Sequence, residues 1–318
     1  MYLAQSFFHS LTAALIVGGA LRAWKIGDPS VRQRFGMLVV LFPLFSFPAY
    51  QLLNPARSSL SFRLGALFDS ARWMGLELPG GVPLGIFFVL MLVVTSLVFS
   101  FQELAPVLRH TVEQADYPEA GEARPGEEDA ALKRVMDSLG SETPVRVLDD
   151  PDMVLFSTTG GEPAVYISSG LMGSTGEGEL RAAIAHELAH IKRSRRPLLV
   201  ALFVLRVLMF FNPVVLVSFR RIVQQEEKIC DDEAVRMTDD AGALLSVLRK
   251  FRAAKEDPPP EGRRLSGLRA SLEQYSHDLL LDARIERLEL NPRPSREGHW
   301  AAFAATVAAV SVVNYFVV

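Results

Sequence analysis

Four long apolar runs without charged residues constrain the fold of this 318-residue chain more than any other feature. The hydrocarbon core of a bilayer is about 30 Å thick, and a helix needs about 20 consecutive apolar residues to cross it. Because such runs are rare in soluble cores, the sequence predicts a multi-pass α-helical membrane protein. The predicted spans cover residues 1–21, 35–53 and 78–102 and a C-terminal segment, residues 298–318.

The composition limits the possible partners. Hydrophobic residues make up 49% of the chain and charged residues 22%, and the mean hydropathy is +0.21. The formal net charge is −3, so no overall positive field attracts nucleic acid, and nucleic-acid binding is not expected. The single cysteine, Cys230, excludes an intrachain disulfide and a cysteine-based zinc knuckle. Any metal site must therefore use histidine and carboxylate side chains.

Basic residues near the spans predict the orientation. They follow the first span and precede the last one: Arg22, Lys25, Arg32, Arg34, Arg293 and Arg296. Lys and Arg are enriched in cytoplasmic loops, so both termini are expected outside and residues 103–297 inside. No basic residue precedes the first apolar stretch, which favours a retained span over a cleaved signal peptide. The expected location is a bacterial inner (plasma) membrane, with residues 103–297 and any functional site within them on the cytoplasmic side.

The polar half of the chain predicts a mixed fold. Acidic, proline and glycine residues in 111–129 indicate a linker, and a proline-rich stretch at 255–264 indicates a surface loop. Helical patterns alternate with short strand patterns, and glycines between the last two strands indicate a hairpin. The sequence therefore predicts an α+β class. The expected helices are 130–139, 179–192 and 279–290, and the expected strands are 145–148, 154–156 and 165–167.

The segment His186-Glu187-Leu188-Ala189-His190 is an HExxH motif. The i, i+4 spacing places both imidazoles on one face of a helix, where they can bind one Zn²⁺. Glu187 is then placed to act as the general base on the attacking water. The alternative, a pair of surface histidines, is weakened because alanines make this helix nearly apolar. One zinc ion per chain is expected.

A catalytic zinc takes three protein ligands, so a third one must come from elsewhere. Glu226 and Glu227 are adjacent candidates further along the chain. In a helix, Glu227 shares the more apolar face with Cys230 and Asp231, which favours Glu227 over Glu226. Asp231 is expected to accept the remaining N–H of a ligating histidine. A solvated acidic helix face is the alternative interpretation.

These motifs resemble two groups of membrane zinc peptidases. The HExxH helix resembles HtpX-type and CAAX-prenyl-protease-type peptidases. Phe211-Asn212-Pro213 and Glu227-x-x-Cys230-Asp231 resemble the beta-lactam-sensing signal-transducer peptidases, the Bla and Mec regulators, as does the stretch 284–288. Both groups are gluzincins, so the resemblance implies a zincin (gluzincin) domain in a membrane-anchored metalloendopeptidase. It implies the metal ligands His186, His190 and Glu227, the base Glu187 and the supporting residue Asp231. The external sensor domain of the transducers is not expected in this chain.

A fifth apolar run, residues 197–219, is interrupted by Arg206, Asn212 and Pro213. A single crossing would place the HExxH histidines and Glu227 on opposite sides of the membrane. Two crossings need about 40 residues, more than the interval between the two motifs contains. The run is therefore expected to form a membrane-dipping hairpin that is broken at Asn212-Pro213.

The expected activity is hydrolysis of peptide bonds in membrane or membrane-proximal proteins, for quality control or regulation. Two alternatives stay open, a signalling protease that cleaves a cytoplasmic repressor and a non-catalytic membrane adaptor. A substrate strand is expected to add to the sheet edge near Val165, Tyr166 and Ile167. The expected partners are a protein or peptide substrate and membrane lipid.

Overall fold

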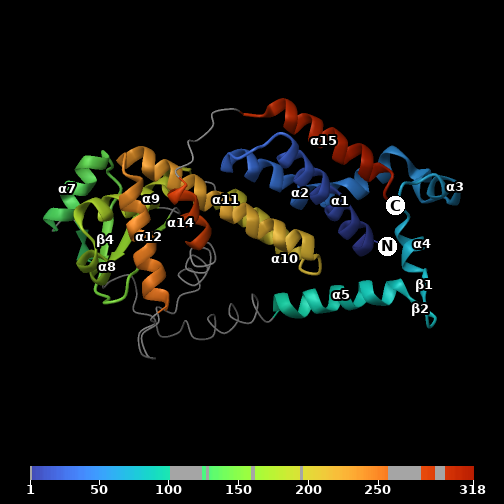
Figure 1. Ribbon diagram of the computed structural model, residues 1–318, viewed down its shortest axis with the longest axis horizontal. Coiled ribbons are helices and arrows are strands. Elements are labelled where there is room, and N and C mark those ends of the chain that lie inside the picture. Colours follow the sequence, from blue (N-terminus) through green and yellow to red (C-terminus); the bar gives the residue numbers. More distant parts are fainter. Residues whose placement is uncertain are drawn as a thin grey trace. The chain divides into compact units, whose positions relative to one another are not determined.

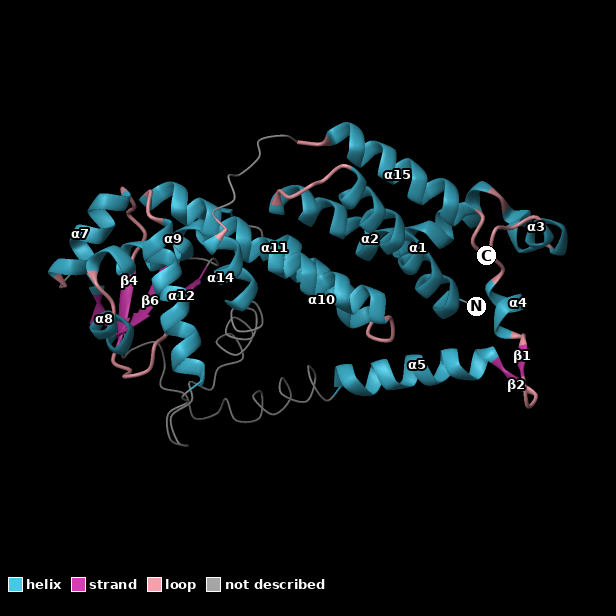
Figure 2. Ribbon diagram, viewed as in Figure 1, coloured by secondary structure: helices cyan, strands magenta, loops and turns pink. Residues whose placement is uncertain are grey.

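The computed structural model describes residues 2–100, 124–126, 129–158, 162–193, 196–256, 281–290 and 298–318. The chain forms two compact units. Unit 1 comprises Met1–Pro106, Leu198–Gln225 and Ser295–Val318, and unit 2 comprises Val107–Pro197 and Glu226–Pro294. Within the described ranges, the strands belong to one four-stranded sheet and one two-stranded hairpin, and helices make up most of the rest (Figure 1, Figure 2). The fold is α+β and mostly helical, as predicted.

In unit 1, three long helices pack together: α1 (Tyr2–Ala23), α2 (Pro29–Leu53) and α15 (Trp300–Tyr315). Helix α2 starts at Pro29 because the Asp28 side chain accepts hydrogen bonds from two backbone N–H groups of the first turn, and proline suits the first helical position. One apolar cluster between these helices consists of Ala13, Val17, Ile26, Val31, Phe35, Val39 and Val310.

Among the described helices, Leu3–Ala23 is the one that is long and apolar enough to cross a membrane. Two further helices, Leu84–Phe99 and Trp300–Tyr315, are apolar but shorter. Helix α2 has the length of a span and contains two prolines, Pro43 and Pro48.

A structured connector joins α2 to α5 (Leu84–Phe99). It contains η1 (Pro55–Ser58), α3 (Leu60–Leu64), α4 (Ser70–Met74) and a hairpin of β1 (Glu77–Leu78) and β2 (Val82–Pro83). The predicted span 78–102 therefore becomes helical only at Leu84. Its first residues form a turn in which Gly80 and Gly81 have φ angles of +102° and +76°, a conformation that glycine adopts readily.

The apolar run 197–219 forms a helix, a turn and a second helix, α10 (Arg196–Leu208) and α11 (Pro213–Thr238). The Asn212 side chain accepts hydrogen bonds from two N–H groups at the start of α11 and donates one to Ser10 of α1. Arg206 is buried beside the rings of Phe99 and Phe219. The segment groups with unit 1, and the boundary between the units falls inside α11, after Gln225.

The sheet of unit 2 has the strand order β3-β4-β6-β5. Strands β4 and β6 are parallel, and the other neighbours are antiparallel. The predicted strands and the β5–β6 hairpin are confirmed, whereas the short β3 lies inside the predicted linker. The bounds are β3 (Arg124–Pro125), β4 (Val145–Leu148), β5 (Leu155–Thr158) and β6 (Ala164–Ser168).

The prediction of a sheet edge at Val165, Tyr166 and Ile167 is wrong. These residues lie in β6, which pairs with β4 on one side and with β5 on the other. Val165 and Ile167 are fully buried. The edges of the described sheet are β3 and β5. Strand β6 lies between β4 and β5, although it follows both of them in the sequence.

The remaining described helices of unit 2 are α7 (Ala130–Leu139), α8 (Ser169–Ser174), α9 (Glu177–Arg193), α12 (Ala241–Glu256) and α14 (Leu281–Glu289). They confirm the predicted helices 130–139 and 179–192. Of the predicted helix 279–290, residues 279 and 280 lie outside the described residues, as does most of the predicted loop 255–264.

Helix α9 has two different buried faces. Leu180, Ile184 and Leu188 follow one another at i, i+4 spacing and pack with the apolar side of the sheet. Ala182 and Ala185 pack instead with apolar residues of α11, α12 and α14. Because alanine is small, this second face lets neighbouring helices come close. The HExxH motif is therefore held between a sheet and a layer of helices.

Candidate functional site

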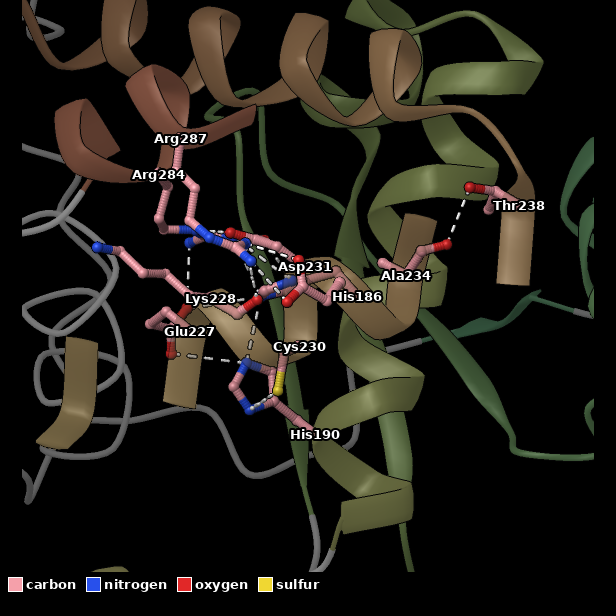
Figure 3. Close-up of polar contacts among 11 residues, drawn as sticks. His186, His190, Glu227, Lys228, Cys230, Asp231, Ala234, Thr238, Arg284 and Arg287 are labelled. Atoms are coloured by element: carbon pink, nitrogen blue, oxygen red, sulfur yellow. Dashed lines mark hydrogen bonds and ion pairs between the residues drawn. The ribbon is translucent and has the colours of Figure 1, made fainter. Parts of the chain in front are cut away.

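Two helices bring the predicted metal ligands together (Figure 3). His186 and His190 lie on successive turns of α9, and Glu227 and Asp231 lie on successive turns of α11. His186, Glu227 and Asp231 are at most 3% exposed. Within the described residues, the group that could hold a metal ion is His186, His190 and Glu227, whose ligand atoms lie within 4.8 Å of one another.

The nitrogen and oxygen atoms of these three side chains converge. The Nε2 atoms of His186 and His190 are 3.2 Å apart. One carboxylate oxygen of Glu227 lies 3.5 Å from His186 Nε2, and the other lies 3.6 Å from His190 Nε2. The two imidazoles and the carboxylate thus direct polar atoms at one another.

The other ring nitrogens face different neighbours. His186 Nδ1 is 3.0 Å from an oxygen of Asp231, and His190 Nδ1 is 3.4 Å from the Cys230 sulfur. The tautomer with a proton on each Nδ1 would donate to these acceptors and keep a lone pair on Nε2 for a metal. Asp231 therefore lies where the sequence predicts it, beside a ligating histidine.

Arg284 of α14 completes the buried cluster, although the sequence assigned it no role. Its guanidinium makes two hydrogen bonds to Asp231, of 2.9 and 2.6 Å, and one of 3.1 Å to Glu227. Its Nη2 atom also lies 3.3 and 3.4 Å from the two ring nitrogens of His186. The i, i+3 neighbour Arg287 pairs with Asp232. The two arginines in Arg284-Ile285-Glu286-Arg287 were the sequence feature that could have indicated this contact, since both pair with acidic residues of α11.

Glu226 and Glu227 differ in direction rather than in burial. Both are 3% exposed, so the burial argument that favoured Glu227 does not separate them. Glu226 instead forms a two-pronged ion pair with Arg193 at the end of α9, with distances of 2.7 and 3.1 Å. Glu227 faces the histidines. A rotation of about 100° per residue along a helix accounts for this difference.

Electrostatics at the cluster favour positive charge. Burial and the charge of Arg284 lower the pKa of His186, but hydrogen bonds to Asp231 and Glu227 outweigh them and raise this pKa to about 9. Burial raises the pKa of Asp231, but Arg284 and His186 hold it below its usual range. The carboxylates thus attract a cation at this point, either a proton on the imidazole or a metal ion.

Burial and nearby carboxylates, Glu227 first among them, raise the pKa of the Cys230 thiol well above its usual value. The thiol is therefore neutral at physiological pH beside His190. This agrees with a packing role and not with a thiolate.

The donor set fits a tetrahedral metal ion. Bonds of 2.0–2.2 Å in a tetrahedron separate two ligand atoms by roughly 3.3–3.6 Å, close to the distances of 3.2, 3.5 and 3.6 Å found here. Charge also fits. With neutral imidazoles, the buried carboxylates of Glu187, Glu227 and Asp231 outnumber the single Arg284 guanidinium by two negative charges. One divalent cation would balance them.

Glu187 and the predicted edge residues also belong to unit 2. Glu187 follows His186 in α9 and is 2% exposed. Val165 and Ile167 belong to the apolar core between the sheet and α9, and are not part of the polar cluster.

Comparison with known proteins identifies the domain. Among curated proteins, none matches the chain. The BlaR1 peptidase M56 family matches residues 86–253, a range that contains the HExxH helix and Glu227. This agrees with the resemblance to the signal-transducer peptidases. The proteins of this family are membrane metallopeptidases. Because the match covers more than half of its length, the chain belongs to the BlaR1 peptidase M56 family.

Proposed function

We propose that this protein is a zinc-dependent endopeptidase in which His186, His190 and Glu227 hold the metal. The observation that carries the proposal is the convergence of three ligand atoms at tetrahedral separations in a buried, negatively charged cluster. Zinc suits this set because it prefers four-coordinate sites built from imidazole and carboxylate groups. Three protein ligands leave one position for the reaction.

Bound zinc would polarise the scissile carbonyl and lower the pKa of water to about 7. Glu187 takes the proton from the attacking water and then gives it to the nitrogen of the leaving amine. Asp231 fixes the orientation of His186 through Nδ1, and Arg284 holds Asp231 and Glu227 in place. The side chain of His190 is 18% exposed, so the substrate enters on the His190 side of the cluster.

The substrate chain is proposed to bind along β5. This strand pairs with β6 on one side and has no other strand beside it in the described sheet. Helix α9, which carries the histidines, contacts β5 directly. An extended peptide added to this edge would be bound through its backbone, with little selection for side chains. This corrects the expected edge at β6 and keeps the proposed mode of binding.

Chelation is the direct test of the metal requirement. Purified protein in lipid nanodiscs is expected to contain about one zinc per chain and to cleave an unfolded protein such as casein. Treatment with 1,10-phenanthroline should remove both metal and activity, and added Zn²⁺ should restore both. Metal content is read by mass spectrometry and cleavage by gel. Full activity in protein stripped of all metal would contradict the proposal.

The family match favours a regulatory role, in which one protein is cleaved in response to a signal, over general quality control. The presence of Glu187 beside the two histidines argues against a non-catalytic adaptor. A comparison of membrane and soluble proteomes with active and inactive enzyme would distinguish one cleaved protein from many.

The membrane topology is proposed to consist of four crossing helices, α1, α2, α5 and α15, with the peptidase unit on the cytoplasmic side. In this proposal, α10 and the start of α11 enter the membrane as a hairpin and do not cross it. The turn at 209–212 and the apolar residues that the two arms share support the hairpin. A hairpin also keeps His186 and Glu227 on one side, as bonds of about 2 Å to a shared metal require.

Cysteine labelling tests this topology. In a Cys230→Ala background, cysteines at Lys192 and Arg221, which flank the hairpin and are exposed, are expected to react with an impermeant maleimide from the same face of sealed vesicles. A cysteine at Arg72, in the connector between α2 and α5, should react from the opposite face. Labelling of positions 192 and 221 from opposite faces would rule out the hairpin and Glu227 as a ligand.

A further inference from the structure

The connector between α2 and α5, residues 54–83, exposes more apolar surface than its small size suggests. Leu60, Leu64 and Leu67 are 71%, 72% and 70% exposed. Soluble proteins rarely leave large apolar side chains grouped in this way unless the patch binds something. Further exposed apolar residues of the connector are Trp73, Leu76, Leu78 and Val82.

The short helix α3 explains how these side chains come to face outward. Leu60 and Leu64 are four residues apart, so they lie on the same side of the helix. Arg63 is turned inward, where it makes two hydrogen bonds of 2.9 and 2.8 Å to Asp69. Asp69 also accepts hydrogen bonds from the first N–H groups of α4. The Arg63–Asp69 ion pair thus links α3 to the start of α4 on the inner side, and the leucines of α3 stay exposed on the outer side.

Arg57 is also directed inward. It is 1% exposed and donates hydrogen bonds to the backbone carbonyls of Tyr315, Asn314 and Val317 at the end of α15. Two of the three arginines of the connector therefore have partners inside unit 1. Its exposed charged residues are Arg72 and Glu77, which have opposite signs.

We propose that the apolar side of the connector, centred on Leu60 and Leu64, lies in the lipid interface of the membrane. The inference rests on the proposed crossing of the bilayer by α2 and α5. Exposed apolar residues continue from the connector onto both of these helices, at Leu53 on one side and at Ile86 on the other. Lipid would cover the apolar residues of the connector and those of the two helices as one continuous surface. A protein that bound only the connector would leave the exposed apolar residues of the helices uncovered.

The composition of the connector agrees with a lipid contact. Trp73 is 47% exposed and stacks on Phe68, and tryptophan is enriched at membrane interfaces. A segment with an apolar side and internally paired charges lies in the plane of the membrane instead of crossing it. Because its exposed charges cancel, the connector is expected to bind neutral and anionic lipids equally.

Fluorescence quenching by brominated lipid tests the inference. The three tryptophans, Trp24, Trp73 and Trp300, are replaced by phenylalanine in the full chain, and single tryptophans are then introduced at Leu60 or Leu64. In phosphatidylcholine nanodiscs, their emission is expected to shift to the blue and to fall when the acyl chains carry bromine near the headgroup. Bromine near the chain ends should quench less. Addition of phosphatidylglycerol should leave the quenching unchanged.

Two reference positions distinguish failure of the lipid-contact inference from failure of the proposed membrane crossing by α5. Glu77→Trp, on the hairpin of the same connector, should stay unquenched because the exposed glutamate native to this position marks a part of the connector that lies in water. Val89→Trp, exposed on α5, should be quenched by deep bromines if α5 crosses the bilayer. Quenching at Val89 without quenching at Leu60 and Leu64 would overturn the lipid contact alone. Absence of quenching at all of these positions would overturn both this inference and the proposed crossing by α5.

Discussion

Replacement of Glu187 by glutamine is expected to abolish peptide-bond cleavage while leaving the metal bound. Glutamine keeps the shape of the side chain and cannot take a proton from water. Loss of general-base catalysis typically lowers the rate by about 10²–10⁴-fold. Because His186, His190 and Glu227 are unchanged, the zinc content should stay near that of the wild type. The measurements are casein cleavage and metal content on the same sample.

Glu142→Gln is the matched control, since Glu142 is exposed in the loop before β4. It should keep both activity and metal. Cleavage by the Glu187 variant at the wild-type rate would rule out the proposed base. Loss of metal in that variant would instead indicate that Glu187 is a ligand.

Glu227→Gln is expected to lose zinc, whereas Glu226→Gln should retain it. The two residues are adjacent and equally buried, so the comparison controls for position and burial. Glu227 faces the histidine nitrogens, and Glu226 binds Arg193. An amide in place of Glu227 removes a negatively charged ligand, which weakens the hold on a divalent cation. An amide in place of Glu226 weakens an ion pair and is expected to lower stability only.

Asp231→Asn should fall between these two variants. Asp231 acts through His186, and replacement of such a partner typically weakens metal affinity by about 10- to 100-fold. Competition with a fluorescent zinc chelator gives the order of the three affinities. Loss of zinc in the Glu226 variant with retention in the Glu227 variant would show that the assignment of the ligand is reversed.

Local patterns in the sequence predicted the local structure well. The i, i+4 histidines on an alanine-rich helix and the strands at 145–148 and 165–167 depend on neighbours in the chain, and such patterns persist in the fold. The position of β6 within the sheet depends on a pairing with β4, which comes earlier in the chain. The residue pattern of β6 alone does not show whether the strand has one neighbouring strand or two.

The composition of the buried cluster shows a second limit. Arg284 follows Asp231 by 53 positions in the chain, and the two side chains meet only in the fold. Burial also failed to separate Glu226 from Glu227, since both are 3% exposed and Glu226 is paired with Arg193. Side-chain partners, which a single sequence does not reveal, decide which of two adjacent carboxylates is available.

Because α9, α11 and α14 converge on one charged cluster, a metal bound there would affect the stability of the folded state as well as catalysis. Without a cation of charge two, unit 2 must bury carboxylates that repel one another, or take up a proton to relieve the repulsion. Binding of zinc to the folded state alone shifts the unfolding equilibrium by mass action. Zinc held as proposed by His186, His190 and Glu227 would link two segments far apart in the chain, so zinc restriction in a cell is expected to lower the amount of folded protein before it lowers the rate of each molecule.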